Sequence, residues 1–262
     1  MRLNVLARRS PIWAALLVIL VAVPSCVAVS PSPPAAPAQI LPAAQPVSPD
    51  PRVGALFPGG GDLHLCSGAV LASSSGDLIL TAAHCLADGI DIRFVPGFDD
   101  DDAAPDDGWQ VDAVYLDPRW IDDQDPMADY AVARVSRADG ARLDSVAGGG
   151  LRLGSSPEPG EAVTVIGYPA GLGGPAECRA PAASRRGYPA LHCDGVVNGF
   201  SGAPWITGST VSGLIGGLDG GGCHEEVSYS PPFDDALVAL VSRAQAGGPG
   251  DEAPAAFDDG CG

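Results

Sequence analysis

Lysine is absent from this chain, in which all 14 basic residues are arginine. The absence excludes mechanisms that need an amine side chain, such as Schiff-base catalysis or a Ser–Lys dyad. Positive charge is also scarce, because 32 acidic residues leave a net charge of −18. The resulting field repels phosphate backbones, so we expect no nucleic-acid partner.

Long hydrophobic runs are equally scarce. Residues 12–23 form an apolar run that is shorter than the roughly 20 residues needed to cross a bilayer. The run follows three arginines and ends in Pro-Ser-Cys, so residues 1–26 predict an export signal and an extracytoplasmic protein. Cys26 closes a lipobox-like sequence and is a candidate for lipidation, which would tether the protein to the outer face of the membrane. A cut after Ala28 would instead give free secretion, and both outcomes stay open.

Composition divides the remainder into three parts. Residues 27–51 are rich in Pro, Ala and Ser without apolar periodicity, which predicts an extended spacer. Residues 52–246 are the predicted folded domain. Residues 247–262, which are rich in Gly, Pro and acidic side chains, are a predicted tail.

Short apolar or β-branched runs fill the predicted domain and are separated by Gly, Asp and Pro, as is typical of strands joined by turns. They form two groups on either side of residues 148–150, so the sequence predicts an all-β fold of two antiparallel barrels or sandwiches. One helix is predicted after Asp234, because apolar residues recur at helical spacing until Arg243 and Gly247. The expected strands cover residues 53–57, 65–72, 78–82, 90–95, 111–116, 130–135, 162–167, 204–207, 211–215 and 227–229.

The chain has seven cysteines, and six remain once Cys26 is removed or lipidated. An even number suits disulfides in an exported protein. The chain lacks CxxC and HExxH motifs, so we expect no metal site and no cofactor. The six cysteines are Cys66, Cys85, Cys178, Cys193, Cys223 and Cys261.

Three short motifs carry the chemistry. Each alone has an ordinary explanation as a core histidine, a strand-edge turn residue or a tight turn. Their joint occurrence is harder to explain by packing. The motifs are Leu-Thr-Ala-Ala-His-Cys at 80–85, Ala-Asp-Tyr-Ala-Val at 128–132 and Asn-Gly-Phe-Ser-Gly-Ala-Pro at 198–204.

In this order the motifs resemble those of the trypsin-like (chymotrypsin-fold) serine endopeptidases, and the chain is most similar to the exported bacterial branch near glutamyl endopeptidases and streptogrisins. The resemblance covers about residues 53–244, and Asp129 follows His84 by 45 residues while Ser201 follows Asp129 by 72. It implies two antiparallel Greek-key β-barrels with a C-terminal α-helix. It also implies a monomer that hydrolyses protein or peptide substrates.

The resemblance assigns a role to each motif. Ser201 would attack the peptide carbonyl to form an acyl-enzyme, with His84 as the base that a weakly nucleophilic hydroxyl needs. Asp129 would hold the imidazole tautomer. The backbone N–H groups of Gly199 and Ser201 would form the oxyanion hole, and a side chain at position 199 would hinder that turn.

The resemblance also implies a His-loop disulfide between Cys66 and Cys85. Two arrangements stay open for the other four cysteines. The lower entropy cost of closing a short loop favours a disulfide between Cys178 and Cys193, which leaves Cys223 to bond to Cys261 in the tail. The alternative joins Cys193 to Cys223, as streptogrisins do.

The sequence gives little indication of which substrate side chain the enzyme would prefer. Trypsins place an Asp six residues before the nucleophile, where this chain has Gly195, and the glutamyl branch has a His where the nearest match is Ile215. Gly216 and Gly217 are expected beside the substrate backbone, leaving an open pocket for a larger or neutral side chain.

Other polar residues are expected outside the catalytic centre. The acidic run at 99–107 begins about 15 residues after His84, where some trypsins hold calcium, but it lacks an ordered ligand spacing and favours a solvated loop. His64, His192 and His224 are expected at the surface or behind the site.

Phe200 precedes Ser201, where trypsins have an Asp that pairs with a new amino terminus after cleavage. Phe200 cannot accept that ion pair, so we expect activity without zymogen cleavage. Two other functions compete with the peptidase. One is a catalytically silent binding protein at the cell surface, and the other is an esterase with the same triad, although the strand-elbow-helix setting of esterases is missing.

Overall fold

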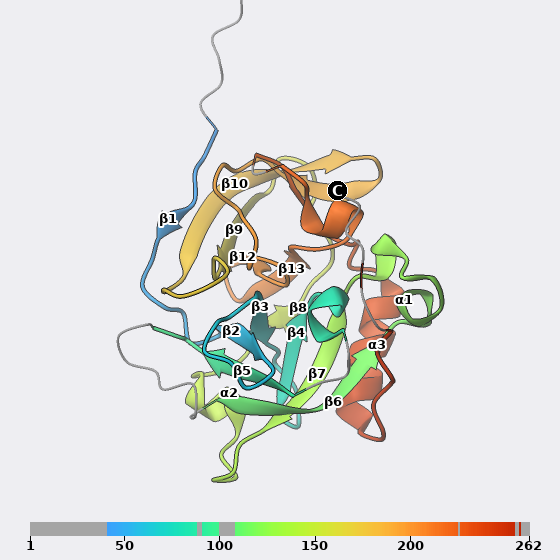
Figure 1. Cartoon of the computed structure of the whole chain (residues 1–262). Helices are drawn as coiled ribbons and strands as arrows, with labels where there is room; N and C mark the ends of the chain where they lie inside the picture. The colour runs from blue at the N-terminus through green and yellow to red at the C-terminus, as the bar shows by residue number, and fades with distance from the viewer. Residues whose placement is uncertain (1–40, 88–90, 100–107, 225, 255–256, 258–262) are drawn as a thin grey trace, which may run out of the picture. The chain divides into compact units, whose positions relative to one another are not determined.

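The computed structural model of the chain (Figure 1) leaves the predicted export signal, Cys26, Cys261 and the acidic run after Asp99 outside the described residues. Within the described residues, the structure contains no helix whose length and hydropathy would suit a membrane span. The described residues are 41–87, 91–99, 108–224, 226–254 and 257.

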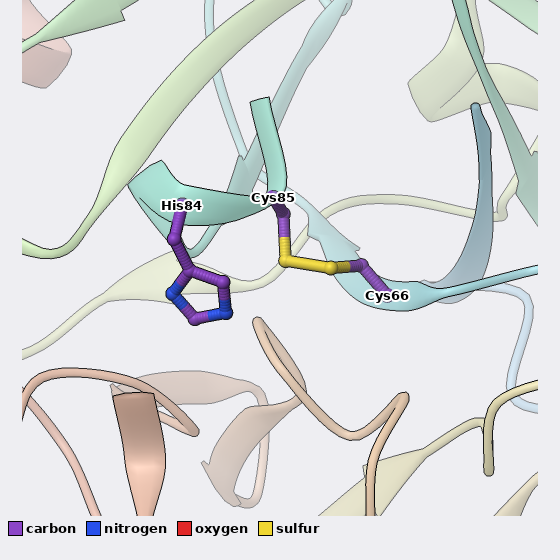
Figure 2. A group of neighbouring side chains, drawn as sticks. All are labelled: Cys66, His84 and Cys85. Atoms are coloured by element: carbon purple, nitrogen blue, oxygen red, sulfur yellow. A yellow bond between two sulfur atoms is a disulfide. The ribbon is translucent and has the colours of Figure 1, made fainter. Parts of the chain in front are cut away.

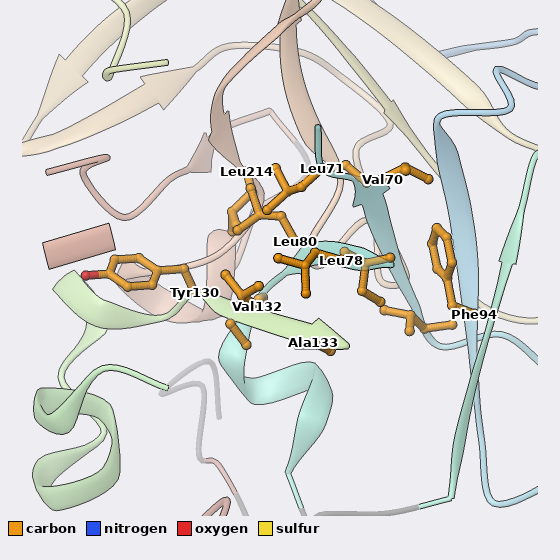
Figure 3. Packing of buried hydrophobic residues seen from close by; sticks show 14 of the residues in the cluster. Val70, Leu71, Leu78, Leu80, Phe94, Tyr130, Val132, Ala133 and Leu214 are labelled. Atoms are coloured by element: carbon orange, nitrogen blue, oxygen red, sulfur yellow. The ribbon is translucent and has the colours of Figure 1, made fainter. Parts of the chain in front are cut away.

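Six strands of the first half close into an antiparallel barrel in the order β2-β3-β4-β7-β6-β5. Strands β2, β3 and β4 are almost entirely buried, because side chains on one face fill the barrel while much of the other face is covered by the rest of the domain. Strand β6 has partly exposed positions. Figure 3 shows Leu78, Leu80, Phe94 and Val132 packed in this core. The strands are β2 (Val53–Pro58), β3 (Cys66–Val70), β4 (Leu78–Thr81), β5 (Ile92–Pro96), β6 (Trp109–Leu116) and β7 (Ala131–Ser136).

The second half forms an eight-stranded sheet in the order β14-β11-β10-β9-β12-β13-β8, with β1 paired to β10. All its pairs are antiparallel except β8 with β13. Its smaller core contains Phe200 and Trp205, while Leu214 of β13 joins the core of the first barrel. The strands are β1 (Gln45–Pro46), β8 (Arg152–Leu153), β9 (Ala162–Gly167), β10 (Ala176–Arg185), β11 (Tyr188–Leu191), β12 (Pro204–Thr207), β13 (Thr210–Leu214) and β14 (Ser228–Tyr229).

The predicted C-terminal helix is α3 (Asp235–Ala246). Asp234 caps it by accepting hydrogen bonds from the N–H groups of Ala236 and Leu237. Its buried face packs into the core of the first barrel although the helix follows the second sheet in the chain. The expected all-β, chymotrypsin-like fold with a C-terminal helix is therefore confirmed, with a closed six-stranded barrel in the first half and an eight-stranded sheet in the second. The sequence did not predict the short helices α1 (Pro118–Asp123), α2 (Leu143–Val146), η1 (Ala83–Leu86), η3 (Pro126–Ala128) and η4 (Leu218–Gly221).

Both ends of the domain extend beyond the predicted boundaries. Part of the proline-rich segment lies along the second sheet, where β1 pairs with β10 and the N–H of Ala44 donates to Asp194 O at 2.8 Å. After α3, the chain runs along β6, where the N–H of Asp251 donates to Val114 O at 2.8 Å. Composition alone did not indicate these backbone pairings.

Two disulfides join described cysteines. Cys66 is bonded to Cys85, and Cys178 to Cys193, which is the local pairing rather than the streptogrisin-like one. Cys223 is also disulfide-bonded. Disulfides are typical of proteins that mature outside the reducing cytosol.

Candidate active site

His84 lies on η1, directly after β4, at the rim of the first barrel. Its Nδ1 lies 2.8 Å from Asp129 Oδ2, and its backbone N–H donates to Asp129 Oδ1 at 3.0 Å. A carboxylate that accepts from Nδ1–H leaves Nε2 unprotonated, so the ring is set up to take a proton on its other side. The structure thus brings together two of the residues that the motifs singled out.

Asp129 is fully buried between η3 and β7. A buried carboxylate is costly unless its oxygens are hydrogen-bonded. In addition to the two donors of His84, it accepts the N–H of Gly217 at 2.7 Å. Gly217 has a φ of +81°, a left-handed conformation that favours glycine, and this turn aims its N–H at the carboxylate.

A second buried group of polar side chains braces the residue that follows Asp129. The Tyr130 hydroxyl donates to Asp117 Oδ2 at 2.8 Å, and Arg119 binds the same carboxylate. Burial alone would raise the pKa of Asp117, but the hydrogen bonds from Arg119 and Tyr130 lower that pKa below its usual value. Burial and the neighbouring Asp117 raise the pKa of Tyr130, which stays a neutral donor.

Ser201 lies in a tight turn between β11 and β12. Gly199 in this turn has a φ of +96°, and an added Cβ would lie 2.1 Å from Ala170 N, so only glycine fits. Among the described residues, no acceptor is assigned to the N–H of Gly199 or of Ser201. Two such N–H groups are the donors that a tetrahedral oxyanion needs.

Ser67 holds this turn against the first barrel and was not singled out as a site residue from the sequence. Its Oγ donates to Gly199 O at 2.8 Å and accepts the N–H of Tyr168 at 2.9 Å. Its N–H donates to Ser201 O at 2.7 Å. Ser67 is fully buried, so these bonds fix the orientation of the turn. Its place next to Cys66 in a Cys-Ser-Gly sequence was the available signal.

Figure 2 shows His84 beside the disulfide of Cys66 and Cys85. The three residues lie close enough together to resemble a metal site. Both sulfurs, however, are used in the disulfide and cannot act as thiolate ligands. The bond ties β3 to η1 and so fixes the segment that carries His84.

Two adjoining cavities open beside Ser201. The first, of about 580 Å³, is lined by His84, Gly199 and Ser201, with Leu65 at one side and Phe257 among the others. The second, of about 520 Å³, also reaches Ser201. None of the described residues that line the second cavity carries a carboxylate or a guanidinium group; they include Val196, Asn198, Ile215, His224 and Ser228.

The comparison with protein families agrees with this geometry. The model of the trypsin-like peptidase domain matches residues 66–216, which is more than half of the chain. The chain belongs to the trypsin-like peptidase domain family. It is therefore a serine endopeptidase, a hydrolase whose substrates are peptides or proteins.

Solved structures with the same fold are distant in sequence. The protease Anisep from Arthrobacter nicotinovorans is 22% identical with a TM-score of 0.66, over 78% of this chain and 100% of that one. A Glu endopeptidase is 17% identical with a TM-score of 0.61, over 80% and 99%. Human heparin binding protein is 17% identical with a TM-score of 0.62, over 80% and 98%. No curated protein sequence matches the chain.

The residue before Ser201 in this trypsin-like peptidase is packed in the core. Phe200 is fully buried, and a Cβ added at Gly167 would lie 2.5 Å from its ring. Val53, at the start of the domain, is an internal residue of the chain, since its N–H donates to Asp50 O and the preceding residues continue to β1. Phe200 thus fills the core before the nucleophile and offers no carboxylate to an amino terminus.

The structure also places two of the other histidines and one residue of the predicted tail. His64 is fully buried, with Nε2 3.0 Å from Gly173 O and the rings of Phe57 and Tyr168 around it, so it lies in the interior rather than at the surface. Phe257, in the predicted tail, lies against His84. His224 is exposed and lines the second cavity, as noted above.

Proposed function

We propose that this peptidase cleaves peptide bonds through an acyl-enzyme, with Ser201 as nucleophile, His84 as general base and Asp129 as the group that orients the imidazole. The observation that supports it most is the 2.8 Å contact between His84 Nδ1 and the buried carboxylate of Asp129, beside a cleft that Ser201 also lines. Packing alone does not require a histidine at a cleft to be hydrogen-bonded to a buried carboxylate, whereas a general base requires it.

The proposed reaction has two halves. Ser201 Oγ bonds to the peptide carbonyl carbon while its proton passes to His84 Nε2, and the N–H groups of Gly199 and Ser201 stabilise the resulting oxyanion. The proton then passes to the leaving amine as the C–N bond breaks. Water then attacks the acyl carbon as His84 takes its proton, and the bond to Ser201 breaks as His84 returns that proton to Oγ.

We also propose a preference for a neutral residue on the acyl side of the cut bond. The cavity next to Ser201 is lined by apolar groups, the neutral polar groups of Asn198 and Ser228 and the imidazole of His224, and none of its described lining residues carries a carboxylate. An arginine or lysine side chain that enters such a cavity loses hydration without gaining a carboxylate partner. Gly216 and Gly217, expected beside the substrate backbone, are buried and are not among the described lining residues of either cavity, whereas Gly220 and Gly222 line both. The substrate backbone is proposed to run along the segment that leads from Gly217 to Gly220.

The protein is proposed to act as a monomer outside the cytoplasm, either secreted or tethered through a lipid on Cys26. The competing function, a catalytically silent binding protein at the cell surface, has one supporting observation, the similarity of the fold to human heparin binding protein. A silent protein of this fold does not need the bonded pair of His84 and Asp129.

A cleavage profile on a mixed peptide library distinguishes the two functions. The full chain should cut peptides after neutral residues, and Ser201→Ala should abolish cutting while the thermal unfolding midpoint stays near that of the parent. Ser209→Ala, at an exposed position between β12 and β13, is the matched control and should retain full activity. Cutting by Ser201→Ala near the parent rate would refute the assignment.

A further inference from the structure

The C-terminal tail returns to the catalytic cleft, where the ring of Phe257 stacks on the imidazole of His84. The ring centroids are 5.2 Å apart and the planes differ by 17°. We propose, on the basis of the function proposed above, that Phe257 is a specificity-determining residue. It forms the wall of a subsite for an apolar side chain of the substrate.

The cleft stays open with Phe257 in this position. His84, Ser201 and Phe257 all line the same cavity of about 580 Å³. The side chain of His84 is 14% exposed, so most of the ring is covered while part still faces the cleft. Phe257 is therefore a wall that a substrate can contact, rather than a plug that excludes it.

Phe257 has a firm support behind it. The ring of Trp120, on α1, lies 5.1 Å from that of Phe257 and is 1% exposed. Contact between two aromatic rings, together with the burial of their apolar surface, stabilises the position of both rings. Phe257 also packs against the core of the first barrel.

The preceding part of the tail is anchored at Asp251. Its carboxylate accepts the N–H of Leu116 at 2.8 Å and pairs with Arg243 of α3. Its own N–H donates to Val114 O of β6. The Tyr115 hydroxyl donates to Gly248 O at 3.0 Å. The tail is thus held on the first barrel at Gly248 and Asp251.

The side of the cleft decides which substrate residue Phe257 contacts. Trp120, which supports Phe257, lies on α1, just before η3 in the chain. Segment η3 in turn lies close to Gly217, because a Cβ added at Gly217 would be 3.1 Å from Pro126 O. Gly217 belongs to the segment along which the acyl part of the substrate is proposed to run. We therefore assign Phe257 to the second residue on the acyl side, P2, which precedes the residue whose carbonyl is attacked.

The test measures kcat/KM for peptides that differ only at P2, with Leu, Val, Gly or Asp at that position. The parent should favour Leu and Val. Phe257→Ala should lose roughly tenfold or more on these two relative to Gly, since one lost apolar contact in a pocket has an effect of this size. Phe257→Tyr keeps the ring and should retain the preference.

Two further variants distinguish an effect of the tail on specificity from a general loss of structure. Asp251→Ala releases the anchor at a distance from the cleft and should flatten the P2 preference in the same way. Glu252→Gln, at an exposed neighbouring position, should leave the profile unchanged.

Three results would overturn the proposal. One is an unchanged P2 profile in Phe257→Ala. Another is an equal rate increase on all peptides, which would indicate a plug. The third is a change confined to the residue after the cut bond, measured with a second peptide set that varies only at that position. If instead hydrolysis by the parent does not depend on Ser201, the proposed function fails first, and the two failures are therefore distinguishable.

Discussion

Replacing Asp129 by Asn tests the proposed triad at the residue that the structure describes most completely. The carboxylate accepts three N–H donors, with the His84 main chain on Oδ1 and both His84 Nδ1 and the Gly217 main chain on Oδ2. An amide has one acceptor oxygen. Whichever way it turns, its NH2 group faces a main-chain N–H, and the negative charge that stabilises the imidazolium is lost.

The magnitude follows from these contacts. If the NH2 group faces His84 Nδ1, the ring proton moves to Nε2, and His84 can no longer accept the proton of Ser201. The loss of this tautomer lowers kcat by about 10⁴ in enzymes of this kind. One buried N–H left without an acceptor costs about 1–3 kcal/mol of folding free energy.

The assay compares kcat and the free energy of unfolding for the parent, Asp129→Asn and Asp125→Asn. Asp125 lies four residues earlier, where it caps η3 by accepting from the N–H of Met127. Asp125→Asn should change only the free energy of unfolding and should leave kcat within a few-fold of the parent value. A kcat for Asp129→Asn within tenfold of the parent would refute the reasoning.

Three further predictions concern the surroundings of the site. Gly199→Ala should lower kcat by about 10² to 10³ in steady-state assays and should also lower the unfolding midpoint, because the added Cβ would lie 2.1 Å from Ala170 N and would displace an oxyanion donor. Since hydrogen bonds, chiefly from Arg119, lower the folded-state pKa of Asp117, its stabilising effect is present above the unfolded pKa of about 3.9 and is lost as pH falls through the folded value. Unfolding midpoints measured across that range should fall more steeply for the parent than for Asp117→Asn. Because Phe200 fills the core before the nucleophile, acetylating the amino terminus of the mature chain should leave kcat/KM unchanged, whereas activity that depends on a free amine at Val53 would contradict this reading.

Local signals explain why most of the first barrel and α3 were predictable. Apolar runs and turn residues marked the strands of the barrel, and Asp234 with apolar residues at helical spacing marked the helix. The disulfide of Cys66 and Cys85 followed from the resemblance, and the structure contains it. These features depend on short stretches of sequence.

Strand β10 shows why other elements were missed. Its buried positions are the small residues Cys178, Ala180 and Ala182, and they alternate with the exposed residues Arg179 and Pro181. Alternation is present, but the residues have low β-propensity and give no apolar run. The strand is stabilised by its pairing with β9 and β11, which the sequence does not display.

Phe257 was missed for a different reason. A single aromatic residue in a Gly- and Pro-rich tail has no periodicity, and its partner His84 is far away in the chain. Ser67 likewise acts through tertiary hydrogen bonds to Gly199 and Tyr168. Contacts between distant segments depend on how the barrels close, which local patterns do not specify.

Mapping a covalent adduct tests the central claim most directly. The full chain is treated with a fluorophosphonate, which reacts with activated serine hydroxyls, and the modified peptide is sequenced by mass spectrometry. The account predicts one adduct, on Ser201, whose formation slows by orders of magnitude in His84→Ala. No adduct on Ser201, or labelling of Ser201 at the same rate in His84→Ala, would contradict it.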